Sequence, residues 1–360
     1  MEIFYYIFGS LLVISTFIPL IPNQHWFFRV FDFGKVQILI LQLLLFLFGC
    51  FFIESKASFY CFQVLLIGCM LYEISLLYKY TPFYKVEKHQ RTNHASQNIT
   101  LVSANVFQFN KDYQKFISYV KKQNPDIILT MESNGDWENA LQVLKQDYPF
   151  FVEVGLENTY GIHLYSKIEI TKSKVHYFVA DDIPSIEALM KTKDGFEFIF
   201  FGVHPPPPSP TEEETSKERD GELLAVAKNI RNNKHSSIVV GDFNNVAWAK
   251  SSVLFRKTSE MIDPRIGRGL ISTFHAKYWF LRFPIDQMFH SSDIFVVKLE
   301  AQENFGSDHL PLFCEFYIDK RNDVQEDLIE HLHKDEMQEV NEMIQEGKAE
   351  DGERESVVTE

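Results

Sequence analysis

The sequence predicts a mixed α/β domain, with two packed β-sheets and helices outside them, preceded by three membrane-spanning helices. Residues 1–84 consist of long apolar blocks with few charges. After residue 98, short β-rich segments alternate with helical segments, and four β-rich segments then follow one another between residues 161 and 203. Consecutive β-rich segments are typical of hairpins, and such sheets bury their faces against each other and against helices.

Three apolar blocks account for most of residues 1–84. Each block is close to the ~20 residues that a helix needs to cross a hydrocarbon core of ~30 Å. The first block lacks the basic start and the small-residue cleavage site of a signal peptide, so we interpret residues 1–84 as a membrane anchor. The expected spans are 4–20, 36–53 and 58–78. The lipid bilayer is therefore the first partner that the sequence predicts.

The distribution of basic residues indicates on which side of the membrane the downstream domain lies. Three spans place the loop at 21–35 and the downstream domain on the same side of the membrane. The opposite side carries Lys56 and the amino terminus. The positive-inside rule therefore favours a cytoplasmic domain. The basic residues on the domain side are Arg29, Lys35, Lys79, Lys85, Lys88 and Arg91.

The downstream elements are expected in a fixed order along the chain. Residues 85–98 are polar and should form a linker, so the domain at 99–318 should fold without the anchor. The prolines at 205–208 predict a stiff loop that ends a strand. The expected strands are 99–106, 126–131, 161–166, 168–179, 186–191, 196–203, 236–240, 294–299 and 311–318, and the expected helices are 111–123, 136–146 and 218–232.

The negative charge is concentrated in a tail at 319–360. This tail holds 15 of the 49 acidic and five of the 35 basic residues, so it carries −10 of the net −14. We expect a solvated helix at 323–345 and a disordered end from Gly347. The rest of the chain is close to neutral. Proteins that grip nucleic-acid backbone usually show a positive excess, so the charge disfavours nucleic acid as the partner.

The four cysteines exclude two classes of site. Cys50, Cys61 and Cys69 fall in the apolar blocks, whereas Cys314 is the single cysteine of the downstream domain. Neither a disulfide framework nor a zinc site can be built from this spacing.

Polar side chains follow the ends of several predicted buried strands, which is where α/β folds place their sites. Each is an acid, an amide or an imidazole, and they come from separate parts of the sequence. One such residue would carry little weight, but the set predicts a single polar site. Its members are Asn105, Glu132, His204, Asp242, Asn244, Asp286, Asp308 and His309.

These residue types suit the hydrolysis of a phosphoester. Mg²⁺ or Mn²⁺ prefers carboxylate oxygen, so Glu132 is the best first metal ligand, and Asp308 completes or adds a site. Asp242 is suited to activate the attacking water. The other polar side chains can donate hydrogen bonds to the phosphoryl oxygens as charge builds. These donors are Asn244, His204 and His309, the last held as an imidazolium by Asp286.

Six ordered motifs resemble those of the endonuclease/exonuclease/phosphatase superfamily over residues 99–318. The two most specific are V-V-G-D-F-N at 239–244 and G-S-D-H-L-P at 306–311. The resemblance implies a DNase I-like four-layer sandwich, with Asn105 and Glu132 at the metal and phosphate and Asp286 paired with His309. The others are S-A-N-V (103–106), M-E (131–132), G-V-H-P (202–205) and F-P-I-D-Q-M (283–288).

The chain departs from that superfamily at one basic position. Lys167 stands in Y-G-I-H-L-Y-S-K where members often have an arginine after the serine, and it becomes a candidate substrate contact. Arg265 and Arg268 are further candidates for a substrate path, with ordinary surface charge as the alternative reading.

The layout of anchor, proline run and G-D-F-N-N-V-A-W resembles a membrane-bound bacterial branch, which implies the cytoplasmic membrane. It is more distantly similar to VanJ-type proteins, whose likeness implies a lipid-linked substrate and a domain outside the cytoplasm. That implication conflicts with the positive-inside argument, and both orientations stay open.

Three functional hypotheses follow. The first is a membrane-anchored, metal-dependent phosphoesterase acting on a phosphoester or pyrophosphate, with a lipid-linked phosphate as the substrate class. The second is a membrane-tethered endonuclease or exonuclease. The third is a catalytically inactive binding module, which the intact polar set disfavours. No protein partner is predicted.

Overall fold

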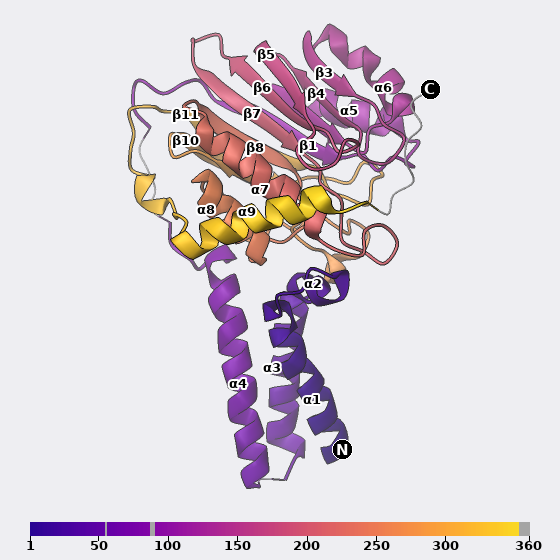
Figure 1. Ribbon diagram of the computed structural model, residues 1–360, viewed down its shortest axis with the longest axis vertical. Coiled ribbons are helices and arrows are strands. Elements are labelled where there is room, and N and C mark those ends of the chain that lie inside the picture. Colours follow the sequence, from indigo (N-terminus) through magenta and orange to yellow (C-terminus); the bar gives the residue numbers. More distant parts are fainter. Residues whose placement is uncertain (55, 87–90, 353–360) are drawn as a thin grey trace.

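A narrow helical stalk carries a larger α/β domain in the computed structural model (Figure 1), which describes residues 1–54, 56–86 and 91–352. Part of the expected linker, 87–90, and the end of the tail, 353–360, lie outside the described residues. The stalk consists of α1 (Glu2–Phe17), α3 (Lys35–Phe52) and α4 (Ala57–Leu77). All three helices are long and apolar enough to cross a membrane.

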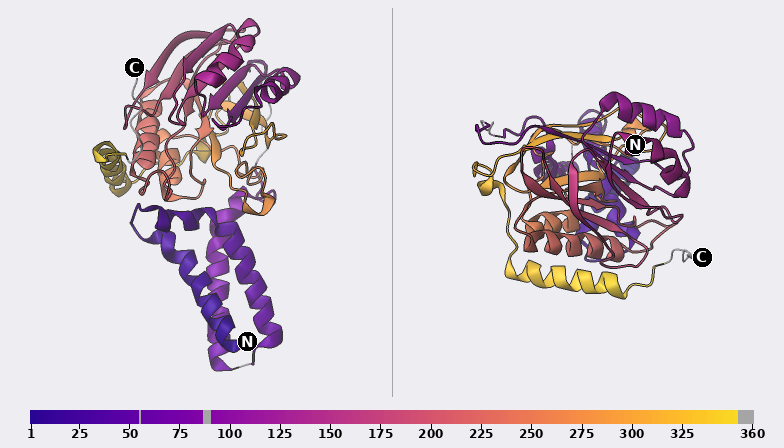
Figure 2. Two further views of the ribbon diagram at one scale, coloured as in Figure 1. Left: turned by 90° about the vertical axis from the view of Figure 1, so that its right-hand side faces the viewer. Right: turned by 90° about the horizontal axis from the view of Figure 1, so that it is seen from above.

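The loop expected at 21–35 contains a short helix instead, α2 (Trp26–Phe33). Figure 2 shows it lying across the end of the stalk, beneath the domain. The His25 side chain caps it by accepting a hydrogen bond from the Phe27 amide at 3.2 Å. Trp26, Val30 and Phe33 follow the i, i+4, i+7 spacing of one helix face, which is the signal that predicts this helix.

The domain contains the two mixed sheets that the sequence predicts. The first has the order β10-β11-β1-β2-β4-β3, and the second has the order β5-β6-β7-β8-β9. In each sheet one central pair is parallel, β1 with β2 and β7 with β8. The strands of the first sheet are β1 (Ile99–Asn105), β2 (Ile127–Met131), β3 (Phe150–Val154), β4 (Ile162–Ser166), β10 (Ile294–Ala301) and β11 (Leu312–Ile318). Those of the second are β5 (Glu169–His176), β6 (Ser185–Lys191), β7 (Glu197–Val203), β8 (Ser236–Asp242) and β9 (Asp286–His290).

Helices cover the outer faces of both sheets, so the domain has four layers. A fully apolar core that includes Leu129, Phe200 and Phe316 fills the space between the sheets. Leu141 and Phe116 belong to the core on the outside of the first sheet, and Leu223 and Phe255 to that of the second. The helices are α5 (Tyr113–Gln123), α6 (Gly135–Leu141), α7 (Lys217–Asn232) and α8 (Lys250–Ser259), with short 3-10 turns at 18–20, 78–80, 142–146, 279–281 and 326–328.

The tail differs from the solvated helix that its charge predicts. Its helix, α9 (Lys334–Ala349), begins later than expected and continues past Gly347. Val340 and Ile344 are buried against α7 and α8, and Lys257 pairs with Glu336 at 2.5 Å. The apolar residues at helical spacing therefore form a packing face, and the acidic residues meet lysines of the domain.

The stalk is packed against the domain, whereas the polar linker predicts a separable anchor. Trp248 lies at the centre of this contact, with its indole Nε1–H donating to the Asp32 carbonyl at 2.7 Å. Its ring lies 5.8 Å from that of Tyr80, at the end of the stalk. Leu77 and Ile285 belong to the same apolar cluster. Removing residues 1–84 would therefore expose part of a core.

A substitution at this contact measures how tightly the two parts are joined. We expect Trp248→Ala to lower the free energy of unfolding by about 3 kcal/mol, as buried aromatic truncations do. Trp248→Phe, which keeps most of the packing and loses only the hydrogen bond to Asp32, should cost about 1 kcal/mol. Thermal unfolding of the full chain in detergent measures both. If Trp248→Ala melted like the parent, the stalk and the domain would be independent.

Candidate active site

Polar residues from both sheets meet at the edge of the sandwich that faces α2. Asn105 ends β1 and Glu132 follows β2, so two parallel neighbours deliver their side chains to one place. In the second sheet, His204 follows β7 and Asp242 ends β8, which are again parallel neighbours. Parallel strands end at the same edge of a sheet, which explains why residues far apart in sequence converge.

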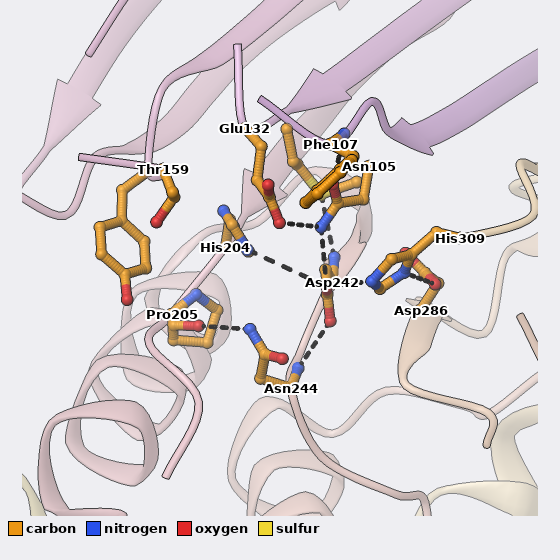
Figure 3. A network of polar contacts seen from close by, with 12 residues as sticks. Asn105, Phe107, Glu132, Thr159, His204, Pro205, Asp242, Asn244, Asp286 and His309 are labelled. Carbon is orange, nitrogen blue, oxygen red and sulfur yellow. Dashed lines mark hydrogen bonds and ion pairs between the residues drawn. The ribbon is translucent and has the colours of Figure 1, made fainter. Parts of the chain in front are cut away.

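Asn105 joins the carboxylates of the two sheets (Figure 3). Its amide Nδ2 donates to Glu132 Oε1 at 2.8 Å and to Asp242 Oδ2 at 3.2 Å. The Gln108 amide also donates to Glu132 Oε2, at 3.1 Å. Glu132 has φ +58°, a left-handed conformation that is uncommon outside glycine and that is found at functional sites.

Backbone geometry explains why the G-D-F-N motif has glycine at 241 and asparagine at 244. A Cβ at Gly241 would lie 1.9 Å from the Val203 carbonyl oxygen, so only glycine allows β7 and β8 to approach here. Asn244 has φ +48°, which asparagine tolerates, and its backbone N–H donates to Asp242 Oδ1 at 2.9 Å. Arg219, buried in α7, holds the turn by donating to the Asn244 carbonyl at 3.0 Å.

His309 lies between two carboxylates. Its Nδ1 is 2.8 Å from Asp286 Oδ2, and its Nε2 is 3.6 Å from Asp242 Oδ2. Burial opposes the charged imidazole, but the carboxylates of Asp286 and Asp242 outweigh it and raise the pKa of His309 to about 10. His309 is therefore a cation at neutral pH. Ser307 fixes the motif by accepting from the His309 amide and donating to the Asn105 carbonyl.

His204 has the opposite character. Burial lowers the pKa of its imidazole to about 4, so the ring is neutral at pH 7. Its Nε2 lies 3.9 Å from Asp242 Oδ2, and its buried Nδ1 has no hydrogen-bond partner among the described residues. A neutral ring with one unpaired nitrogen is suited to bind a group that enters the site.

The site opens into a cavity of about 550 Å³ that extends to α2. At one end lie the catalytic candidates, and at the other end lie apolar side chains. The polar end contains Glu132, His204, Asp242, Asn244, Asp308 and His309, with Tyr160 and Glu212 beside them. The apolar end contains Trp26, Val30, Phe33, Phe274, Phe283 and Ile285, with prolines 207, 208 and 210 along the side.

A divalent cation fits the polar end. The described lining residues include four carboxylates, of Glu132, Glu212, Asp242 and Asp308, against two cations, the Arg29 guanidinium and the His309 imidazolium. Burial raises the pKa of Glu132 to about 7, and the hydrogen bonds from Asn105 and Gln108 and the charge of His309 only partly oppose this shift. An anionic substrate would be repelled here unless a cation were bound. Oxygen ligands of this kind suit Mg²⁺ or Mn²⁺.

Oxygen and nitrogen atoms of Asp242, Asp286 and His309 are also close enough together to hold a metal ion. Their geometry favours a different role. Both imidazole nitrogens face a carboxylate, and a protonated ring satisfies the two carboxylates at once. A metal ion bound here would compete with that proton, because it would need the same ring nitrogen and carboxylate oxygens.

The structure brings together all eight residues that the strand ends predict, but it does not bring the three predicted substrate contacts to the cavity. Arg265 is buried and pairs with Asp263 at 2.8 Å. Arg268 donates to backbone carbonyls, including that of Val296 at 2.7 Å. Lys167 donates to the Asn124 side chain at 2.6 Å, away from the cavity. Each basic group already has a structural partner.

Several residues that line the cavity are not part of any of the six sequence motifs. Tyr160 packs against His204 with ring centroids 5.4 Å apart, and its hydroxyl donates to Glu212 at 2.5 Å. The apolar end comes from α2 and the segment 274–285. The amphipathic spacing of α2 could have identified it as a helix, but no local pattern places that helix over a site formed by residues between 105 and 309.

Comparisons with known proteins agree with this geometry. Residues 102–309, more than half of the chain, match the Endonuclease/Exonuclease/phosphatase family. No curated protein matches the chain significantly. Many solved structures share its fold.

Three of these structures illustrate the similarity. D. rerio TDP2, complexed with a single-strand DNA product, is 18% identical with a TM-score of 0.52, covering 61% of this chain and 99% of that one. An endonuclease/exonuclease/phosphatase family protein from Bacteroides thetaiotaomicron is 21% identical with a TM-score of 0.51, covering 62% and 99%. The human Nocturnin catalytic domain, with bound sulfate, is 15% identical with a TM-score of 0.51, covering 61% and 94%.

The matched residues span both halves of the sandwich and contain all eight residues of the polar site. The fold is that of the solved family members, and the motifs meet in one cavity. The chain belongs to the endonuclease/exonuclease/phosphatase family of phosphoester hydrolases.

Proposed function

We propose that the chain is a membrane-anchored, divalent-metal-dependent phosphoesterase that hydrolyses a phosphoester or pyrophosphate bond in a lipid-linked substrate. One observation carries this proposal: the cavity runs from the catalytic carboxylates to α2, which lies at the end of three helices apolar enough to span a membrane. An amphiphile fits such a cavity, with its phosphate at the polar end and its chain toward the stalk. The bacterial cytoplasmic membrane is the proposed location.

The side chains divide the chemistry among them. Glu132 and Asp308 would hold Mg²⁺ or Mn²⁺, with Asn105 orienting the Glu132 carboxylate. A bound cation would polarise the phosphoryl oxygen and stabilise the leaving group. Asp242 accepts the proton of the attacking water. Burial raises the pKa of Asp242, and the charge of His309 opposes part of this shift.

Hydrogen-bond donors complete the site. The His309 and His204 rings each turn Nε2 toward Asp242, at 3.6 and 3.9 Å, and the Asn244 side chain, which donates to the Pro205 carbonyl at 3.0 Å, lies beside that carboxylate (Figure 3). Donors fixed in a buried site stabilise charge that develops on the phosphoryl oxygens in the transition state.

Nucleic acid is the alternative substrate, because D. rerio TDP2 shares the fold and was solved with a DNA product. The acidic cavity and the near-neutral domain disfavour it here. The full chain in detergent should therefore hydrolyse a lipid diphosphate faster than plasmid DNA at equal enzyme concentration. Faster cleavage of plasmid DNA would favour the tethered nuclease instead, and an inert protein would favour the binding module.

Metal dependence gives a further prediction. Exhaustive chelation should abolish hydrolysis of a simple phosphodiester, and Mg²⁺ or Mn²⁺ should restore it. Glu132→Gln keeps the shape of the side chain but removes its charge, so it should require a much higher Mg²⁺ concentration for half-maximal rate. A titration of rate against Mg²⁺ measures both effects. Undiminished turnover of the chelated parent would contradict the metal site.

A further inference from the structure

Four exposed apolar side chains project from one turn of the domain. They are consecutive, at 278–281, and we call this segment the aromatic turn. Trp279 is 80% exposed, Phe280 54%, Leu281 46% and Tyr278 42%. Large apolar side chains are scattered singly on most surfaces, and a contiguous group of this kind marks an interaction site.

The aromatic turn lies beside the end of the stalk. Gln37, in the first turn of α3, donates from its side-chain amide to the Phe280 carbonyl at 3.0 Å. Just after the turn, the Phe283 ring packs edge-on against Phe33 of α2, with centroids 5.9 Å apart. Figures 1 and 2 both show this segment, in orange, reaching from the domain to the end of the stalk. The turn is therefore level with the start of a candidate membrane span.

The surroundings identify what covers this turn. On α3, the neighbouring outward side chains Ile40 and Leu44 are 51% and 57% exposed, so the surface that continues from the turn is itself apolar. Tryptophan and tyrosine favour the boundary between headgroups and acyl chains. Lys277 precedes the turn, and a lysine at this level can pair with lipid phosphates. Arg282, which follows the turn, donates to the His275 and Ala276 carbonyls. This chemistry fits a lipid surface.

The same segment forms one wall of the cavity. Phe274 and Phe283 pair across the base of the aromatic turn and both line the cavity, opposite Trp26, Val30 and Phe33 of α2. The apolar end of the cavity thus lies between two elements that meet the membrane surface.

We propose that the aromatic turn inserts into the membrane interface and, together with α2, forms an entrance through which a lipid phosphoester passes from the bilayer to the catalytic carboxylates. The entrance rests on the proposed function, whereas insertion of the turn does not. The substrate's phosphate stays near the headgroup level and its chain remains in lipid. The lipid chain therefore does not have to cross water on its way to the site.

Fluorescence quenching tests insertion without any substrate. The full chain is reconstituted in vesicles of phosphatidylcholine brominated on the acyl chains, which quench only tryptophans that contact lipid. We expect Trp279→Phe to lose a large part of the quenching seen in the parent. The matched control adds Phe151→Trp to Trp279→Phe, because Phe151 is 43% exposed on β3, at the far end of the domain. That tryptophan should not be quenched.

Two results would overturn insertion. One is equal fractional quenching of the parent and Trp279→Phe, and the other is equal quenching of tryptophan at 151 and at 279.

Activity tests the entrance. A variant with serine at Trp279, Phe280 and Leu281 should lose on the order of tenfold in kcat/KM on a lipid diphosphate held in vesicles, because less apolar area anchors the turn. Its rate on water-soluble bis(p-nitrophenyl) phosphate should match the parent, and Phe151→Ser should match the parent on both. An unchanged lipid rate, or an equal loss on both substrates, would overturn the entrance. If the parent hydrolyses neither substrate, the proposed function fails while quenching still decides insertion.

Discussion

Replacing His309 with alanine should lower kcat by on the order of 10²–10³, the loss that follows removal of one donor to a developing oxyanion. The reason is its position between Asp286 and Asp242, which keeps the ring charged and beside the attacking water. Metal binding should persist, because Glu132 is held by Asn105 and Gln108 rather than by His309. Single-turnover kinetics on a soluble phosphodiester, with Mg²⁺ titrated, separate the two effects.

Asp286→Asn tests the pairing of that carboxylate with His309. Burial favours the neutral ring, so losing the Asp286 charge lowers the pKa of His309 from its value of about 10. The active form is the protonated ring, which exists below its pKa. The alkaline fall in rate should therefore begin at a lower pH in the variant than in the parent. A pH–rate profile of both proteins measures the shift.

The double variant provides the control. Because both residues serve one function, Asp286→Asn should add little to the loss already caused by His309→Ala. If the double variant instead lost the product of the two single losses, with an unchanged pH profile, Asp286 would be a structural residue at the start of β9.

Asp242→Asn is expected to be the most damaging single substitution, with a loss on the order of 10²–10⁴ in kcat, the contribution of a positioned general base. The side chain is buried and faces Asn105, His204 and His309, so no other described carboxylate can take its place beside all three. Asparagine has the same shape and can still accept from the Asn244 amide. Folding should therefore be preserved, and the loss should appear in chemistry.

Thermal unfolding and kinetics of Asp242→Asn should be measured together. A cooperative transition at a somewhat lower melting temperature than that of the parent is expected, because the asparagine amide would face the Asn105 donor and the His309 cation where the carboxylate faced them. Retention of more than about a tenth of the parent rate would remove Asp242 from the role of general base.

The sequence predicts the polar site well because its residues follow strand ends. Glu132 and Asp242 come directly after apolar runs that can only be buried strands, and parallel neighbours deliver such ends to one edge. The resemblance of the motifs at 283–288 and 306–311 adds the pairing of Asp286 with His309, although the short strand that carries Asp286 is not among those that the sequence predicts. The two sheets and their covering helices follow from the same periodicity.

The remaining features depend on tertiary contacts. The sequence around Arg265 does not reveal that its side chain is buried and forms an ion pair with Asp263, two residues earlier. The acidic tail looks solvated until Val340 and Ile344 meet α7 and α8. Likewise, α2 has a readable helix face, but its position over the cavity depends on how the stalk docks against Trp248. The contacts of α9 and of α2 join segments more than 70 residues apart, beyond the reach of local patterns.

The most direct test is the release of phosphate from a lipid diphosphate in vesicles that contain the full chain. With Mg²⁺ present, the parent should release phosphate from the embedded lipid with a higher kcat/KM than from a short-chain, water-soluble analogue with the same headgroup. Asp242→Asn should release almost none from either. The proposal would be contradicted if the parent left both lipids intact while it cleaved plasmid DNA under the same conditions.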